Sequence, residues 1–132
     1  MRLAIALLSA AALGVGVSYA ATPPPTQLAF AVYPQGVGAP GVRRYTLRCG
    51  PAGGTVPHPA AACRVLASLP HPFAPVPSGA ICSAIALGPQ EAVVTGRLRG
   101  KPVSAHLTLR DSCEIERWRK LAQVVPGFAV RR

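Results

Sequence analysis

Side chains able to act as acids, bases or nucleophiles are few and scattered in this sequence. Three histidines could serve as the general acid and base of a small basic ribonuclease, with Lys101 or an arginine stabilising the charge that develops on the phosphate. They are His58, His71 and His106. Two of them adjoin prolines in loop-like segments, and the third lies on the polar side of a predicted strand. We therefore favour surface histidines over a catalytic pair.

Carboxylates and nucleophile motifs give no stronger indication of catalysis. The acidic residues are Glu91, Asp111, Glu114 and Glu116. Three of them surround one predicted helix start instead of forming a separated pair for glycoside hydrolysis. The segment 96–101 is one residue too short for a phosphate-binding loop, and no serine has nucleophile-elbow neighbours. The sequence predicts neither an enzyme nor a cofactor.

The N-terminus has the pattern of a secretory signal peptide. Residues 1–20 comprise a charged start, a short apolar run and the small-residue close Ser18-Tyr19-Ala20. Cleavage after this close leaves about 112 of the 132 residues, enough for one domain over 21–132 with a flexible arm over 21–26. No second apolar run of spanning length follows. We therefore expect a secreted, extracellular protein with no membrane span.

All the cysteines fall in the predicted mature part. They are Cys49, Cys63, Cys82 and Cys113. In an oxidising compartment an even count favours two disulfides, and three pairings are open. No pair has CxxC spacing and no histidine pair has the spacing of a zinc finger, so we expect no metal.

The chain is strongly basic. It has 14 Lys and Arg against 4 Asp and Glu, a net charge of +10, which becomes +9 when Arg2 leaves with the signal peptide. Such a field suits anionic surfaces, nucleic acid or an acidic partner. Few aromatic side chains interleave with the basic ones as stacking platforms for bases. We expect no specific nucleic acid. Charge alone does not choose among these partners, and a solvated basic surface is the interpretation we favour.

Apolar periodicity predicts one small α+β domain. The predicted strands cover residues 27–33, 42–49, 92–95 and 103–110, with 128–130 as an optional last strand, and the predicted helices cover 60–69 and 111–125. Of these strands, 92–95 and 103–110 are predicted to form a hairpin. Pro126 ends the second predicted helix. The expected fold is an antiparallel sheet of four or five strands packed with two helices, with two disulfides.

One apolar segment stands apart from these elements. Ile81–Leu87 lies between the proline-rich stretch 70–77 and Gly88-Pro89, and it carries Cys82. Prolines hold a chain extended and stiff. A cysteine that ties this segment to the domain would make a rigid loop that presents a peptide. The alternative is an ordinary buried strand.

Four motifs follow one another along the mature chain. They are Tyr45-Thr46-Leu47-Arg48-Cys49-Gly50-Pro51, then His58-Pro59-Ala60-Ala61 with Cys63, then Cys82-Ser83-Ala84-Ile85, and finally Gly96 to Val103 running on to Cys113-Glu114. This ordered set resembles the Streptomyces subtilisin inhibitor-like family of secreted serine protease inhibitors. The resemblance implies disulfides Cys49–Cys63 and Cys82–Cys113, an antiparallel sheet with two helices, and a homodimer joined through the sheet.

The resemblance also implies a reactive bond between Ala84 and Ile85. Ala84 would enter the primary specificity pocket of a subtilisin-like or elastase-like serine protease, and Ile81 would fill the apolar fourth subsite. Further contacts would come from Cys82, Ser83, Ala86 and Leu87. The leading hypothesis is a protein inhibitor of subtilisin-like serine proteases, and the alternative is a cationic binding protein that acts on anionic surfaces or nucleic acid.

Overall fold

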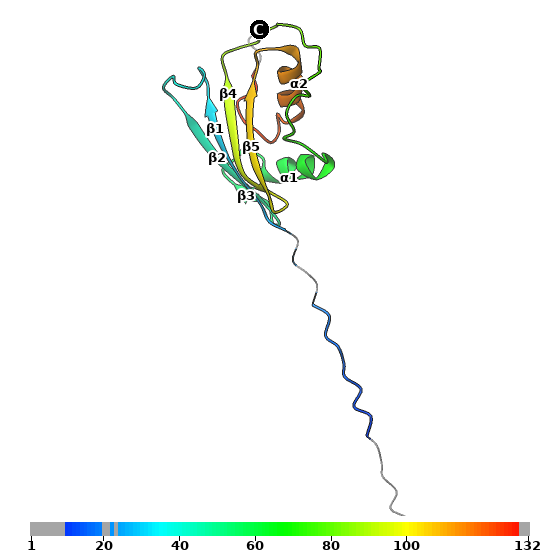
Figure 1. Ribbon diagram of the computed structural model, residues 1–132. Helices are drawn as coiled ribbons and strands as arrows, with labels where there is room; N and C mark the ends of the chain where they lie inside the picture. Colours follow the sequence, from blue (N-terminus) through cyan, green and yellow to red (C-terminus); the bar gives the residue numbers. More distant parts are fainter. Residues whose placement is uncertain (1–9, 20–21, 23, 130–132) are drawn as a thin grey trace, which may run out of the picture.

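The computed structural model describes residues 10–19, 22 and 24–129. Its elements are, in order, β1 (Thr26–Tyr33), β2 (Arg43–Cys49), β3 (Gly53–Gly54), α1 (Pro59–Ser68), β4 (Glu91–Leu98), β5 (Lys101–Thr108) and α2 (Ser112–Lys120). Residues 10–19 form neither helix nor strand (Figure 1). No helix in the described ranges is long and apolar enough to cross a membrane. The predicted signal-peptide cut lies at residues 20–21, outside the described residues.

The strands form one antiparallel sheet in the order β3-β2-β1-β4-β5. β1 lies at its centre, where Leu28 is opposite Leu47 of β2 on one side and Gly96 of β4 on the other. Every second residue of β1 is buried, as expected for a strand with one face on the core. The predicted α+β fold is confirmed, with five strands, two helices and two disulfides.

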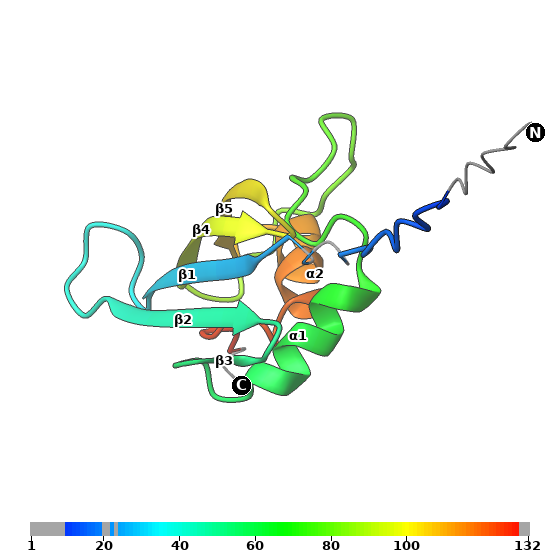
Figure 2. The same cartoon turned by 90° about the horizontal axis from the view of Figure 1, so that it is seen from below.

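Both helices cover the same face of the sheet (Figures 1 and 2). Large apolar side chains from the sheet, such as Phe30 and Leu107, pack there with Leu66 of α1 and Trp118 of α2 and are almost completely buried. Burial of each such side chain contributes about 1.5 to 3 kcal/mol. The core therefore fixes α2 firmly against the sheet, and α2 is the element to which the candidate functional loop is attached.

The predicted hairpin is confirmed and closes with a two-residue turn. Leu98 pairs with Lys101, and Arg99 and Gly100 between them both have positive φ, 48° and 80°. Within this turn, the Arg99 N–H donates to Thr26 Oγ1 at 3.0 Å, and the Gly100 N–H donates to Pro25 O at 2.8 Å. The turn thus holds the start of β1 at one end of the domain.

The optional last strand is not formed. Phe128 and Ala129 are outside any strand, and Val130 lies outside the described residues. The Phe128 ring instead packs on Trp118, with ring centroids 6.2 Å apart. The fifth strand is β3, where a Cβ on Gly54 would lie 2.3 Å from the carbonyl oxygen of Thr46. Only glycine allows this approach, with its φ of +115°.

The second helix is shorter than predicted. Asp111 caps it by accepting from the Glu114 N–H at 2.9 Å, and it ends at Lys120. The Val124 and Val125 N–H groups both donate to Leu121 O at 2.8 Å, so the chain continues in turns. These turns still bury Leu121, Val124 and Val125. The predicted helix 111–125 therefore does supply core residues along its whole length, but its last part is not helical.

Candidate functional site

The segment between α1 and β4 contains the candidate loop. Its proline-rich part runs beside α2 over a hollow of about 550 Å³. Arg117 of α2 donates from Nη2 to Phe73 O at 3.0 Å, and its Nη1 donates to His106 O of β5 at 3.0 Å. One guanidinium thus ties the proline-rich part to both the helix and the sheet. At its end, the Ala80 N–H donates to Pro77 O at 3.0 Å and turns the chain toward Ile81.

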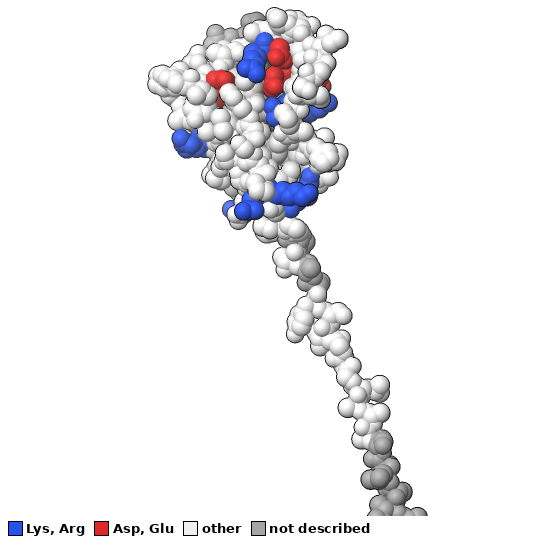
Figure 3. Space-filling view, viewed as in Figure 1, with Lys and Arg blue, Asp and Glu red and all other residues white. Residues whose placement is uncertain are grey.

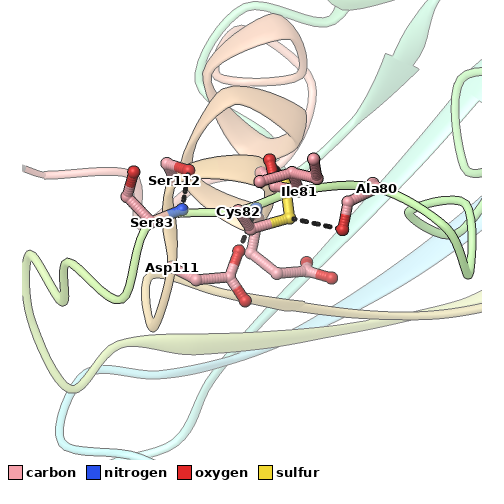
Figure 4. Close-up of a disulfide and its surroundings, with 8 residues drawn as sticks. Ala80, Ile81, Cys82, Ser83, Asp111 and Ser112 are labelled. Atoms are coloured by element: carbon pink, nitrogen blue, oxygen red, sulfur yellow. Dashed lines mark hydrogen bonds between the residues drawn. A yellow bond between two sulfur atoms is a disulfide. The ribbon is translucent and has the colours of Figure 1, made fainter.

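A disulfide joins the loop to the first turn of α2. Cys82 and Cys113 are bonded, with their Cα atoms 5.5 Å apart (Figure 4). The other disulfide, Cys49–Cys63, joins β2 to α1 with a Cα separation of 5.7 Å. Both pairings implied by the resemblance are confirmed. All the cysteines are thereby bonded, so none offers a thiolate to a metal.

Two hydrogen bonds fix the residue that follows Cys82. The Ser83 N–H donates to Ser112 Oγ at 2.8 Å, and the Ser112 N–H donates to Ser83 O at 3.0 Å (Figure 4). Successive residues of an extended chain direct their main-chain groups to opposite edges. Within the described part of the chain, the main-chain groups of Cys82 and Ala84 make no hydrogen bond. Within the described residues, the main-chain groups of Cys82 and Ala84 are therefore available to a binding partner.

The loop exposes apolar side chains. Ile81 is 99% exposed and Ile85 is 56% exposed, and Ala84 and Ala86 are exposed as well. Apolar surface left in water costs about 25 cal/mol per Å², so an isolated domain gains nothing from this arrangement. Exposed apolar groups on a fixed backbone are typical of an interaction site. The alternative of a buried strand over Ile81–Leu87 is wrong.

The chain bends outward at Ala84 and is anchored again after it. The Ile85 N–H donates to Ser83 O at 2.8 Å, which closes a three-residue turn around Ala84. Two residues later, the Leu87 N–H donates to Leu109 O at 2.9 Å, and the half-buried Leu87 side chain packs against the core. The free part of the loop is therefore Ala84 to Ala86, with a fixed point on each side, at Ser83 and at Leu87.

The sequence-based candidates fall into two groups. Ile81, Cys82 and their neighbours up to Leu87 lie together in this loop, as predicted. The three histidines are all exposed and belong to separate elements: His58 precedes α1, His71 lies in the proline-rich part and His106 lies on β5. His106 Nε2 lies 3.0 Å from a carboxylate oxygen of Glu91. Ser112, whose hydroxyl holds the loop at Ser83, is not among the sequence-based candidates. Its position beside Cys113 is the one sequence signal that points to it.

Comparison with known proteins agrees with this geometry. The model of the subtilisin inhibitor-like family matches residues 24–110. Among solved structures, the chain is similar to one from the crystal structure of Streptomyces caespitosus sermetstatin in complex with Bacillus licheniformis subtilisin, with 28% identity and a TM-score of 0.50. The match covers 79% of this chain and 99% of that one. No curated protein matches the sequence. Because the family model spans well over half of the sequence, the chain belongs to the subtilisin inhibitor-like family.

Proposed function

We propose that the chain is a secreted inhibitor of subtilisin-like serine proteases that acts by binding and not as an enzyme. Its family supports this function, as does its similarity to a structure of a subtilisin complex. The observation that carries the proposal is the Ile81–Leu87 loop, which combines exposed apolar side chains with a backbone fixed by a disulfide and two hydrogen bonds.

The main-chain pattern supports a reactive bond between Ala84 and Ile85. A protease binds its substrate as an added strand, so the residue before the cut and the residue two positions earlier offer their main-chain groups to the enzyme. In this loop those residues are Ala84 and Cys82, whereas the groups of Ser83 between them are used by Ser112. A bond shifted by one residue would require Ser83 to leave Ser112.

The side chains support a protease with an apolar cleft. The Ala84 methyl group suits a small or medium-sized primary pocket, as in subtilisin-like or elastase-like enzymes, and lacks the charge that trypsin requires. Three residues earlier, Ile81 offers a fully exposed apolar side chain for the fourth subsite. Ser83, Ala86 and Leu87 extend the contact. Because the loop is already ordered, binding loses little conformational entropy.

Slow cleavage is compatible with inhibition in this geometry. Hydrolysis of the Ala84–Ile85 bond leaves two new ends that stay attached to the domain. One end is held by the disulfide two residues upstream, and the other by the Leu87–Leu109 hydrogen bond two residues downstream. The ends therefore remain at a high effective concentration, and resealing competes with release.

The test is a titration of subtilisin and of elastase with the oxidised mature protein, followed by mass spectrometry of the recovered inhibitor. Stoichiometric inhibition with a slow single cut between Ala84 and Ile85 is the expected result. Rapid degradation without inhibition would contradict the function, and a stable cut at another bond would contradict the site.

Ser112→Ala should weaken inhibition without unfolding the domain. The change leaves the Ser83 N–H without its partner, which costs about 1 to 2 kcal/mol and corresponds to roughly tenfold weaker binding of subtilisin with faster cleavage of the loop. Inhibition constants and cleavage rates measure both effects. Ser112→Thr keeps the hydroxyl and should retain inhibition, and Ser104→Ala on the exposed face of β5 is the control. Equal inhibition by Ser112→Ala and the wild type would show that Ser112 does not position the loop.

Secretion is proposed from the sequence pattern alone. Residues 1–20 act as the signal peptide, and residues 21–132 form the exported domain with a short arm over 21–26. Expression of the full chain in a secreting host, followed by N-terminal sequencing of the exported product, tests this boundary. A product that starts at Ala21 is expected, whereas full-length protein retained in the cell would contradict the proposal.

A homodimer joined through the sheet is the proposed assembly. The face opposite the helices is exposed and has small side chains at its centre, where Ala29 lies between Thr46 and Thr95. Arg44 and Arg97 lie on the same face, so two copies would repel one another. We therefore expect a dimer that strengthens with added salt. Sedimentation equilibrium at two salt concentrations measures this, and a monomer in both would contradict it.

A further inference from the structure

The acidic side chains of the domain gather at one end of the strands, whereas basic ones lie at both ends. β4 runs from Glu91 to Leu98 and β5 returns from Lys101, so the β4–β5 turn lies at one end of the sheet and the start of β4 at the other. All the acidic residues belong to the second end: Glu91 begins β4, and the other three follow β5 in or beside α2. Figure 3 shows the red side chains in the upper part of the domain with blue ones beside them, whereas only blue ones lie at its lower end.

The lower end carries five basic residues and none of the chain's acidic ones. We call this surface the basic end, and it comprises Arg48, Arg64, Arg97, Arg99 and Lys101. The sheet register places Arg48 and Arg97 on either side of Gln27, about 10 Å apart across two strand spacings. Arg64 follows Cys63, and Arg48 precedes its disulfide partner Cys49. All five residues are exposed.

Arg99 has a structural role within the basic end, whereas Arg48, Arg64 and Lys101 form no ion pair in the described part of the chain. Arg99 donates from its guanidinium to Leu66 O at 3.1 Å and to Leu69 O at 3.3 Å, at the end of α1. Arg48 and Arg97 repel one another across the two strand spacings, and an anion bound between them would relieve that repulsion.

The basic end and the reactive-site loop lie at opposite ends of the domain. The loop is bonded to the first turn of α2, which follows β5, and it leads into the start of β4. The β4–β5 turn is one whole strand length away, about 25 Å for eight residues. A protease bound at the loop would therefore leave the basic end uncovered.

We propose that the basic end binds an anionic polysaccharide while the loop remains free to bind a protease. The surface extends over a strand, a hairpin and a helix, which suits a flexible anionic chain. A hollow of about 460 Å³ lined by Arg99, Lys101 and His71 provides a seat beside the hairpin. The exposed large apolar side chains of the folded domain are Val37, Val42, Ile81 and Ile85. None belongs to the basic end, so it offers no apolar side chain for insertion into lipid. Phe73 also lines the hollow, but its ring packs against the core and is half-buried, which leaves little of it to stack on nucleic acid bases.

The experiment uses heparin, a sulfated polysaccharide, as the probe for the oxidised mature protein, alone and saturated with subtilisin. The test variant is Arg48→Gln/Arg64→Gln/Lys101→Gln, and the control is Arg43→Gln/Arg44→Gln/Lys120→Gln, which removes the same charge from outside the basic end. We expect the test variant to lose heparin affinity by about tenfold or more and to show a shallower dependence on salt. The control should lose less than about threefold, and both should inhibit subtilisin like the wild type.

Several results would overturn the proposal. Equal losses in the two variants would show that net charge, and not the basic end, binds the probe. Loss of heparin binding on saturation with subtilisin would show that the two sites overlap. Tighter binding of a single-stranded oligonucleotide or of anionic lipid vesicles at the same salt would assign the surface to another partner. Because heparin binding is measured without protease, failure of the inhibitor function leaves this test intact.

Discussion

Replacement of Ala84 by lysine should turn the protein toward trypsin. If Ala84 enters the primary specificity pocket, a lysine there reaches the carboxylate at the base of the trypsin pocket, whereas the wild-type methyl group leaves that carboxylate without a partner. Residues at the centre of an interface contribute 2 kcal/mol or more. The ratio of the inhibition constants for subtilisin and trypsin should therefore shift toward trypsin by at least about thirtyfold. Parallel titrations of both enzymes measure the shift.

The matched control for this variant is Ala86→Lys. Ala86 is also exposed in the same loop, and the change adds the same charge two residues further along. It should give no gain in tight inhibition of trypsin, because that side chain lies beyond the proposed reactive bond. If Ala86→Lys gains and Ala84→Lys does not, the reactive bond lies elsewhere. An equal gain for both variants would point to general electrostatic attraction.

Burial on one side of the sheet explains which parts of the fold could be predicted. In β1, Leu28, Phe30 and Val32 alternate with exposed or half-buried residues, so the strand is visible as a period of two. The start of α2 could also be predicted from a local pattern, because the capping residue Asp111 and its partner Glu114 are only three positions apart. The disulfide pairing was different: it followed from the family resemblance, since cysteine spacing alone left three pairings open.

Contacts between distant residues explain what could not be predicted. β3 consists of two glycines, which carry no apolar pattern and pair only because Gly54 can approach Thr46 closely. Phe128 has an apolar neighbour pattern typical of a strand, but Trp118 is a better partner than a free sheet edge. Ser112 supports Ser83 across 29 positions, and the only local signal for that contact is that each serine adjoins one cysteine of the Cys82–Cys113 pair. The candidate loop was predictable, but the side chain that holds it was not.

Removal of the Cys82–Cys113 disulfide should convert the inhibitor into a substrate. In a Cys82→Ser/Cys113→Ser variant, the upstream side of the proposed reactive bond is held, among the described residues, by the two Ser83–Ser112 hydrogen bonds, each worth about 1 kcal/mol. Ends released by cleavage then separate faster than they reseal. We expect inhibition of subtilisin to weaken by about a hundredfold or more, with rapid cleavage at Ala84–Ile85, as measured by inhibition assays and time-resolved mass spectrometry.

The other disulfide provides the control for stability. Cys49→Ser/Cys63→Ser opens a loop of 14 residues between β2 and α1, whereas the Cys82–Cys113 bond closes 31. Chain entropy predicts losses of about 3 and 3.5 kcal/mol in the free energy of unfolding, so both variants should be destabilised by similar amounts.

The two variants differ in their effect on the candidate loop, because only Cys82→Ser/Cys113→Ser detaches the loop from α2. At a temperature where circular dichroism shows both to be folded, the control should still inhibit. If both variants lose inhibition equally, global stability accounts for the effect and the loop needs no tether. If only the Cys82→Ser/Cys113→Ser variant becomes a substrate, the covalent link to α2 is what makes a cleavable peptide act as an inhibitor.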